Sequence, residues 1–264
     1  WFTGSKNAMK GLGFFLGGAP LEAFGFSQAL WLMAGVLALI LIGVVLSLPA
    51  LKGPSKPSKS ARELFGKSRG VNLLALARIG LFGARDVWFV VGVPVFLYAN
   101  GWTFPMVGAF LALWTIGYGL VQAAAPALVR RSVDGLSTEV PAAKLWSLML
   151  LVVPLALAGI LALAPPRPDW ILVTGLCLFG IIFAVNSSVH SYLILAYAGS
   201  EKAAEDVGFY YAANAAGRFL GTLLSGLLYQ LGGLGACLIG SALMLATCWA
   251  ATLTLPVTVE TKPI

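Results

Sequence analysis

The sequence predicts an all-α membrane protein, a polytopic helix bundle with about eight transmembrane helices. The first observation is composition: 59% of the 264 residues are hydrophobic and 10% are charged. Soluble domains carry about 25% charged residues. The second is that apolar stretches recur with the ~20 residues that a helix needs to cross a ~30 Å hydrocarbon core. The third is that one basic segment, 52–70, divides these stretches unequally.

Each apolar stretch is predicted to form one helix because its loops are short and its length matches the bilayer. The predicted spans are 4–24, 28–49, 71–99, 103–129, 144–164, 170–198, 206–231 and 235–257. Six helices after a central basic loop are typical of the second half of a chain built from two six-helix repeats. We therefore expect twelve helices in all, the first four preceding Trp1. Residues 1–49 would end the N-terminal bundle, 50–70 would form a linker, and 71–264 would form the C-terminal bundle.

The basic residues predict the orientation of these helices. Six cations lie in the 52–70 linker, and five more lie in or beside the other loops and the terminus on the same side, including Lys202 and Lys262. The opposite loops hold only Arg167. This asymmetry places the linker and the C-terminus in the cytoplasm. Because it explains the net charge of +7, no nucleic-acid partner is expected.

A short internal repeat supports the two-half organisation. The segment 10–18 aligns without a gap with 218–226, sharing glycines and leucines and starting with Lys10 in one copy and Arg218 in the other. These segments would be helices five and eleven of two parallel six-helix repeats. Their small residues would also let helix backbones approach closely.

Charged residues within the apolar spans are the main candidates for function. Arg85 and Asp86 lie halfway along the span 71–99, with Arg78 two turns earlier on the same face. A central arginine must face protein or a water-filled cavity. Arg85 could bind an anion, with Asp86 as partner or proton carrier. Alternatively, Asp86 could form an internal ion pair with Arg85 or with Arg78.

A polar stripe marks one face of the span 206–231. Spacings of three and four residues place on that face Tyr211, Asn214, Arg218, Thr222 and Ser225. The stripe could line a substrate cavity or form interhelical hydrogen bonds. One cavity would then hold three cations, Lys10, Arg85 and Arg218. This composition suits a polyanionic ligand such as a phosphate-like oxyanion.

The remaining candidates are fewer. His190 in the span 170–198 could switch with proton binding or act as an ordinary polar residue. As the only histidine, it excludes a multi-histidine metal site, and no resident metal or cofactor is expected. No soluble-enzyme motif is present, so the protein is not expected to be an enzyme. The pentapeptide 115–119, TIGYG, resembles a potassium-channel filter, but it lies in the middle of a predicted helix.

Three longer motifs add a family resemblance. They are GSKNAMKGLGFFLGG at 4–18, FGARDVWFVVGVPVFL at 82–97 and DVGFYYAANAAGR at 206–218. With them the chain resembles the major facilitator superfamily and, within it, the organoarsenical efflux transporters. This resemblance implies a multi-pass protein of the bacterial inner membrane that exports 1-arseno-3-phosphoglycerate by alternating access. It also implies a functional link to a glyceraldehyde-3-phosphate dehydrogenase, which makes that ester from arsenate.

The resemblance leaves alternatives open. The protein could export another organic anion or a drug, and a channel or a polytopic membrane enzyme remains a more distant alternative. An enzyme at membrane depth would have only Asp86 and His190 as candidate catalytic groups.

Overall fold

The computed structural model describes residues 13, 16, 20, 21, 23–47, 67–129, 132–198 and 203–257. Every regular element within them is a helix. The helices are α2 (Phe26–Ser47), α4 (Arg69–Phe89), α5 (Gly92–Ala99), α6 (Phe104–Leu128), α7 (Glu139–Ala162), α8 (Pro168–Tyr197) and α9 (Ala203–Leu253). Six helical stretches in this part of the chain are long and apolar enough to cross a membrane. The prediction of an all-α, multi-pass membrane protein is thereby confirmed.

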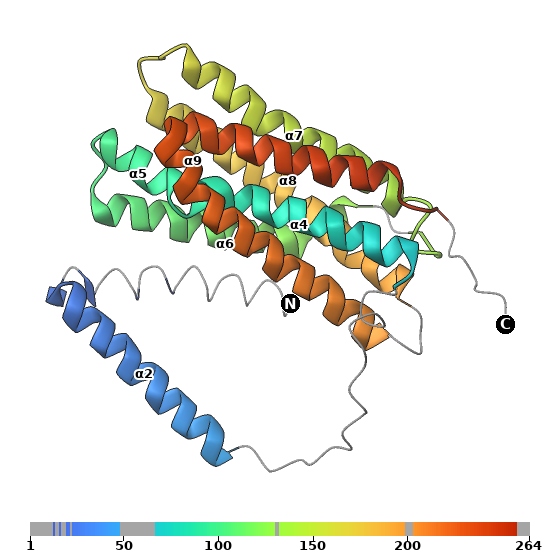
Figure 1. Cartoon of the computed structure of the whole chain (residues 1–264), viewed down its shortest axis with the longest axis horizontal. Helices are drawn as coiled ribbons and strands as arrows, with labels where there is room; N and C mark the ends of the chain where they lie inside the picture. Colours follow the sequence, from blue (N-terminus) through green and yellow to red (C-terminus); the bar gives the residue numbers. More distant parts are fainter. Residues whose placement is uncertain are drawn as a thin grey trace.

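The longest helix, α9, is a hairpin of two arms. Its 51 residues include a non-helical break at Gly232 and Gly233, and Gly233 has a φ of 61°. Glycine adopts this left-handed backbone without steric cost. The chain reverses there, and the two arms diverge from the turn (Figure 1). The arms correspond to the predicted spans 206–231 and 235–257. The predicted span 4–24 lies almost entirely outside the described residues.

The predicted span 71–99 corresponds to one candidate membrane span, Arg69–Ala99, but its helix is interrupted. The helix stops at Phe89 and resumes at Gly92. Pro94 has no backbone N–H to donate to the carbonyl of Val90, which weakens the helix at this point. The hydroxyl of Ser225 in α9 accepts a hydrogen bond from the backbone N–H of Val91, at 3.1 Å. A side chain from another helix therefore stabilises the break.

The connections between successive helices of α4–α9 lie alternately at the two ends of the bundle. The α5–α6 loop, the α7–α8 loop and the turn of α9 lie at one end, and the start of α4 and the end of α9 lie at the other (Figure 1). Arg69 and Lys144 belong to the second end and Arg167 to the first. The orientation of these ends in the membrane stays a prediction from the charge asymmetry.

This arrangement predicts a topology that reporter fusions can measure. A reporter in the 52–70 linker or after Ile264 should be cytoplasmic, because cations are retained on that side. A reporter at Asn100 or Asp169 should be external. An external signal from the linker would contradict both the orientation and the number of helices after it.

Helix α4 lies against both arms of α9 at very short range. A Cβ atom on Gly80 would meet the carbonyl oxygen of Met244, at 2.5 Å, and a Cβ on Gly217 would collide with the carbonyl oxygen of Ile79. A Cβ on Gly221 would collide with the carbonyl oxygen of Gly83. Small residues at such contacts allow membrane helices to pack backbone to backbone.

These glycines give a prediction for stability. Gly217→Ala and Gly221→Ala should each lower the free energy of unfolding by about 1–3 kcal/mol, because the added methyl group would collide with the backbone of α4. Gly226→Ala is the matched control, because nothing lies within 4 Å of a Cβ at that position of the same helix. Thermal unfolding in detergent would measure all three. Equal midpoints for Gly221→Ala and Gly226→Ala would contradict the close α4–α9 contact.

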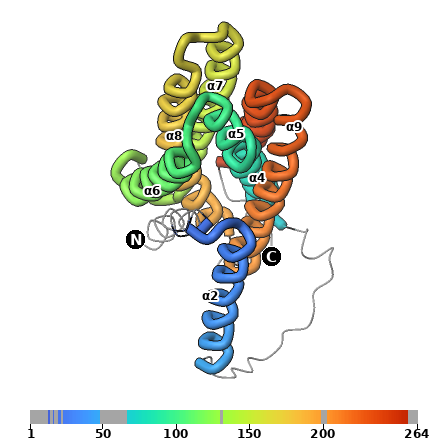
Figure 2. Tube along the Cα trace, turned by 90° about the vertical axis from the view of Figure 1, so that its left-hand side faces the viewer, coloured from blue at the N-terminus to red at the C-terminus, as the bar shows by residue number. Residues whose placement is uncertain are grey.

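Helix α2 lies apart from the bundle of α4–α9 (Figures 1 and 2). Of its 22 residues only Ala29 is buried. Among the candidate spans, α2 has the highest hydropathy. An apolar helix with so little contact to the other helices is suited to contact with lipid or with other helices.

Candidate functional site

The candidate site is centred on Asp86, whose carboxylate binds two arginines. Asp86 is 1% exposed. Nε of Arg85 donates a hydrogen bond to Oδ1 of Asp86 at 2.6 Å, and Nε of Arg218 donates to Oδ2 at 2.9 Å. Arg85 and Asp86 belong to α4 and Arg218 belongs to the first arm of α9. The three groups carry a formal net charge of +1, so the cluster is electropositive.

The glycine contact between α4 and α9 positions these charges. Gly83 and Gly221 lie backbone to backbone, and a Cβ on Gly221 would be 3.0 Å from the Cβ of Asp86. Arg218 is three residues before Gly221 and therefore lies on the same side of α9. A larger residue at either glycine would separate the two helices and increase the distance between Arg218 and Asp86.

The two arginines have different surroundings. The guanidinium carbon of Arg85 lies 5.3 Å from the ring centroid of Phe82 and 5.6 Å from that of Phe183. Its side chain is 13% exposed, whereas that of Arg218 is 47% exposed. Aromatic rings attract a cation electrostatically, and the low dielectric strengthens its other interactions. Arg85 is therefore held in the interior, while Arg218 can be reached from outside the α4–α9 contact.

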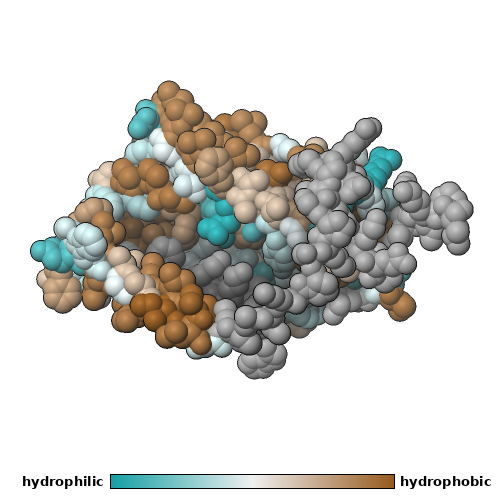
Figure 3. Space-filling view, turned by 60° about the horizontal axis from the view of Figure 1, so that its bottom comes forward, coloured by the Kyte–Doolittle hydropathy of each residue, from teal (hydrophilic) through white to brown (hydrophobic). Residues whose placement is uncertain are grey.

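One face of the molecule is polar at its centre. Figure 3 shows a hydrophilic patch bordered by hydrophobic side chains on the face that the bottom of Figure 1 presents. A polar patch among apolar helices is typical of a bundle interior or an aqueous cavity rather than of a lipid-facing surface.

The structure separates the predicted polar stripe of α9 into two parts. Tyr211 is 54% exposed, Thr222 is exposed and Asn214 is half-buried. Ser225 is fully buried and binds the backbone of Val91, so it stabilises the break after α4 instead of lining a cavity. Within the stripe, Arg218 binds Asp86 of α4 and Ser225 binds the break after α4, whereas Tyr211 and Thr222 are exposed.

Lys10, the third predicted cation, lies outside the described residues. The structure therefore brings together three of the predicted site residues, Arg85, Asp86 and Arg218.

Arg78 is a second buried cation, and it does not pair with Asp86. It is 4% exposed and donates from Nη1 to the hydroxyl of Ser187, at 3.1 Å, and to the carbonyl of Ser187, at 3.2 Å. Its guanidinium carbon lies 4.1 Å from the ring centroid of Phe82 and 4.8 Å from that of Tyr210. Among the described residues it has no carboxylate partner. The expected alternative of an Arg78–Asp86 pair is wrong.

His190 lies on α8 one turn after Ser187, in the same buried region. It is fully buried, and neither ring nitrogen has a hydrogen-bond partner within the described part of the chain. Arg78 and His190 thus form a polar centre distinct from the Asp86 cluster. The position of Arg78 within an apolar span was the signal that could have identified it as a candidate site residue.

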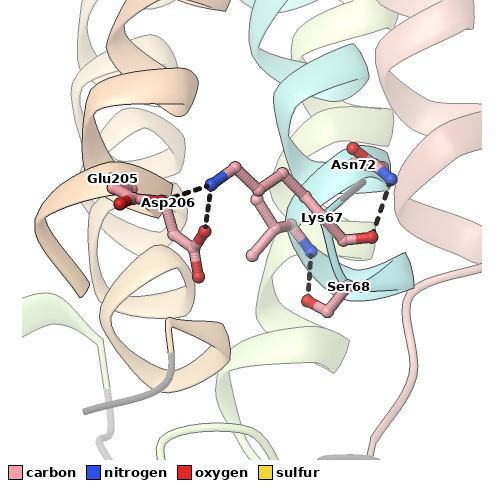
Figure 4. Close-up of polar contacts among 6 residues, drawn as sticks. Lys67, Ser68, Asn72, Glu205 and Asp206 are labelled. Atoms are coloured by element: carbon pink, nitrogen blue, oxygen red, sulfur yellow. Dashed lines mark hydrogen bonds and ion pairs between the residues drawn. The ribbon is translucent and has the colours of Figure 1, made fainter. Parts of the chain in front are cut away.

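At the linker end of the bundle, Lys67 joins two distant segments (Figure 4). Its Nζ lies 3.0 Å from Oδ1 of Asp206 and 3.5 Å from Oε2 of Glu205, in the first turn of α9. The Lys67 side chain is only 6% exposed. The adjoining Ser68 caps α4 by accepting a hydrogen bond from the N–H of Val71. The end of the linker is therefore fixed to the helix that carries Arg218.

The fold and these buried charges define the class of the protein, a multi-pass membrane helix bundle with a polar interior. Comparison of the chain with family models, with curated proteins and with solved structures found no match.

Proposed function

We propose that the protein is a secondary active transporter of the major facilitator type that exports an organic oxyanion, 1-arseno-3-phosphoglycerate, from bacteria exposed to arsenate. The observation that carries the proposal is the bridging of Arg85 and Arg218 by the buried carboxylate of Asp86. Two arginines from different helices meet an oxyanion there, and one of them is half-exposed. The substrate itself follows from the family resemblance of the sequence.

The arginines suit such a substrate because guanidinium groups bind carboxylate, phosphate and similar oxyanions with paired hydrogen bonds. Asp86 holds them ready in the absence of substrate and would have to yield part of its contact with Arg218 when an anion binds. Since the cluster keeps a net charge of +1, it attracts an anion without a metal ion. Movement of α9 relative to α4 would then couple occupancy of the site to alternating access.

Arg78 supports a substrate with two anionic ends. It lies two helical turns from Arg85, or about 10 Å along α4. The same ring, that of Phe82, lies beside both guanidinium groups. One end of the ester could bind between Arg85 and Arg218, and the other could bind at Arg78 when α4, α8 and α9 move apart.

Export of this anion requires little driving energy. A membrane potential that is negative inside favours the exit of anions by about 2.3 kcal/mol per charge for each 100 mV. The ester is made in the cytoplasm by a glyceraldehyde-3-phosphate dehydrogenase and falls apart outside, which makes its export irreversible. Asp86 and His190 remain the candidates for proton coupling.

The principal alternative is export of another organic anion or a drug through the same arginines. A channel is disfavoured because the filter-like pentapeptide lies inside α6, where the hydroxyl of Thr115 donates to the carbonyl of Leu111 at 2.8 Å. Its carbonyls therefore belong to a helix and cannot line a pore. A membrane enzyme is disfavoured because Asp86, one of its two candidate groups, is engaged by two arginines.

A resistance assay separates these functions. Production of the expected twelve-helix transporter together with its glyceraldehyde-3-phosphate dehydrogenase, in bacteria that lack other arsenic exporters, should restore growth on arsenate. It should not restore growth on arsenite, because the dehydrogenase does not use arsenite. Resistance to both arsenate and arsenite would contradict the proposed substrate. Resistance to neither compound would also contradict it and would favour another organic anion.

A further inference from the structure

A groove between α7 and α8 is an apolar cavity outside the charged site. Its volume is about 510 Å³. Three residues of each helix line the groove along its length: Val152, Ala156 and Ile160 of α7, and Trp170, Thr174 and Leu178 of α8. The largest of them are about half exposed, so the groove opens on the outer surface of the bundle. Both helices are long and apolar enough to cross a membrane, so in a bilayer this opening would face lipid.

Arg167 lies at one end of the groove. Its side chain is 69% exposed, and its Nε is 3.7 Å from Oδ1 of Asp169. The other oxygen of Asp169 accepts a hydrogen bond from Nε1 of Trp102, at 3.1 Å. Within the described part of the chain this is the only ion pair of Arg167, so its terminal nitrogens can bind another acceptor. Arg167 is also the one cation that the sequence places on the external side, so neither topology nor the transport site explains it.

The dimensions of the groove match one leaflet of a bilayer. Trp102 and Trp170 lie beside its charged end, with ring centroids 6.0 Å apart, and tryptophans gather where the hydrocarbon meets water. From Trp170 to Leu178 the groove extends eight helical residues, or about 12 Å. Half of a ~30 Å hydrocarbon core is about 15 Å. The charged end is therefore at headgroup level and the apolar part is at acyl-chain level.

We propose that this groove is a binding site for one membrane phospholipid of the outer leaflet, with an acyl chain along α7 and α8 and the phosphate at Arg167. A phosphate accepts paired hydrogen bonds from a guanidinium group. In the groove the acyl chain would exchange apolar contacts with neighbouring lipids for apolar contacts with the protein. The ion pair between the phosphate and Arg167 would make the binding specific. The site is separate from Asp86 and does not depend on the proposed transport.

Native mass spectrometry of the delipidated protein in detergent tests the site, with dioleoyl phosphatidylglycerol as the probe. The wild-type protein should bind one lipid more tightly than any further lipid. Arg167→Gln should weaken that binding about tenfold or more, because a charged hydrogen bond is lost. Ala156→Phe should abolish it by filling the groove.

Two matched variants and two further probes serve as controls. Lys144→Gln removes a cation at the opposite end of α7, and Ala162→Phe adds bulk to an exposed position of the same helix away from the groove; both should leave the binding unchanged. With the wild-type protein, dioleoylglycerol lacks the phosphate and inorganic phosphate lacks the chains, so both should bind at least tenfold more weakly. Equal lipid binding by Arg167→Gln, equal binding by Ala156→Phe, or tight binding of phosphate alone would each overturn the proposal.

Discussion

Arg85→Lys and Arg218→Lys should each lose most transport while the protein still inserts at normal levels. Lysine keeps the charge but lacks the planar fork that binds an oxyanion through two hydrogen bonds. Loss of one such charged partner costs roughly 1.5–3 kcal/mol, which corresponds to a ten- to hundredfold loss of affinity. Initial rates of arsenic export and the concentration dependence of those rates would measure this effect.

Arg69→Lys is the matched control, since Arg69 begins α4 and is exposed far from the site. If Arg85 and Arg218 only hold α4 and α9 together, lysine would preserve the ion pair with Asp86, and transport would remain near wild type. In that case Arg85→Ala with Asp86→Ala would be no worse in protein level than Arg85→Ala alone. Normal export by both lysine variants would place the binding site elsewhere.

The Asp86→Asn variant should behave in the opposite way. Asparagine has nearly the same shape but cannot neutralise two arginines, so both become available to substrate. We expect the affinity for a phosphorylated anion such as 3-phosphoglycerate to rise about tenfold, the value of one charged hydrogen bond. The free energy of unfolding should fall by about 3 kcal/mol, because a buried charge loses its partner. Calorimetric titration and thermal unfolding would measure the two effects.

Glu205→Gln controls for the loss of a carboxylate, because Glu205 also contacts a cation of the bundle but lies at the linker end. It should leave the anion affinity unchanged. An unchanged or weaker affinity in Asp86→Asn would show that Asp86 does not compete with substrate for the arginines.

Hydropathy predicted most of the helices well because the bilayer fixes their length. The spans 103–129 and 170–198 differ from α6 and α8 by one or two residues at each end. The prediction for α7 began five residues late, since its first turns include Glu139 and Lys144. Polar residues at the membrane surface are compatible with a helix, but hydropathy alone does not reveal this.

The site was predicted less completely, because partners from distant segments decide it. The sequence placed Arg85 and Asp86 side by side and Arg218 near the middle of its helix. It could not show that Asp86 binds both arginines, since this depends on the contact between Gly83 and Gly221. For the same reason the sequence left open whether Ser225 lines a cavity or forms an interhelical hydrogen bond; the structure shows the second, with the backbone N–H of Val91 as donor.

The most direct test of the account is arsenic export from proteoliposomes. The transporter would be reconstituted with its cytoplasmic side facing the vesicle lumen. The lumen would contain a glyceraldehyde-3-phosphate dehydrogenase, its substrates and arsenate. Arsenic should appear outside only with wild-type transporter and active dehydrogenase, and Arg218→Lys should reduce the rate at least tenfold. Equal release without dehydrogenase, or equal release by wild type and Arg218→Lys, would contradict the proposal that these arginines carry an organic arsenate ester across the membrane.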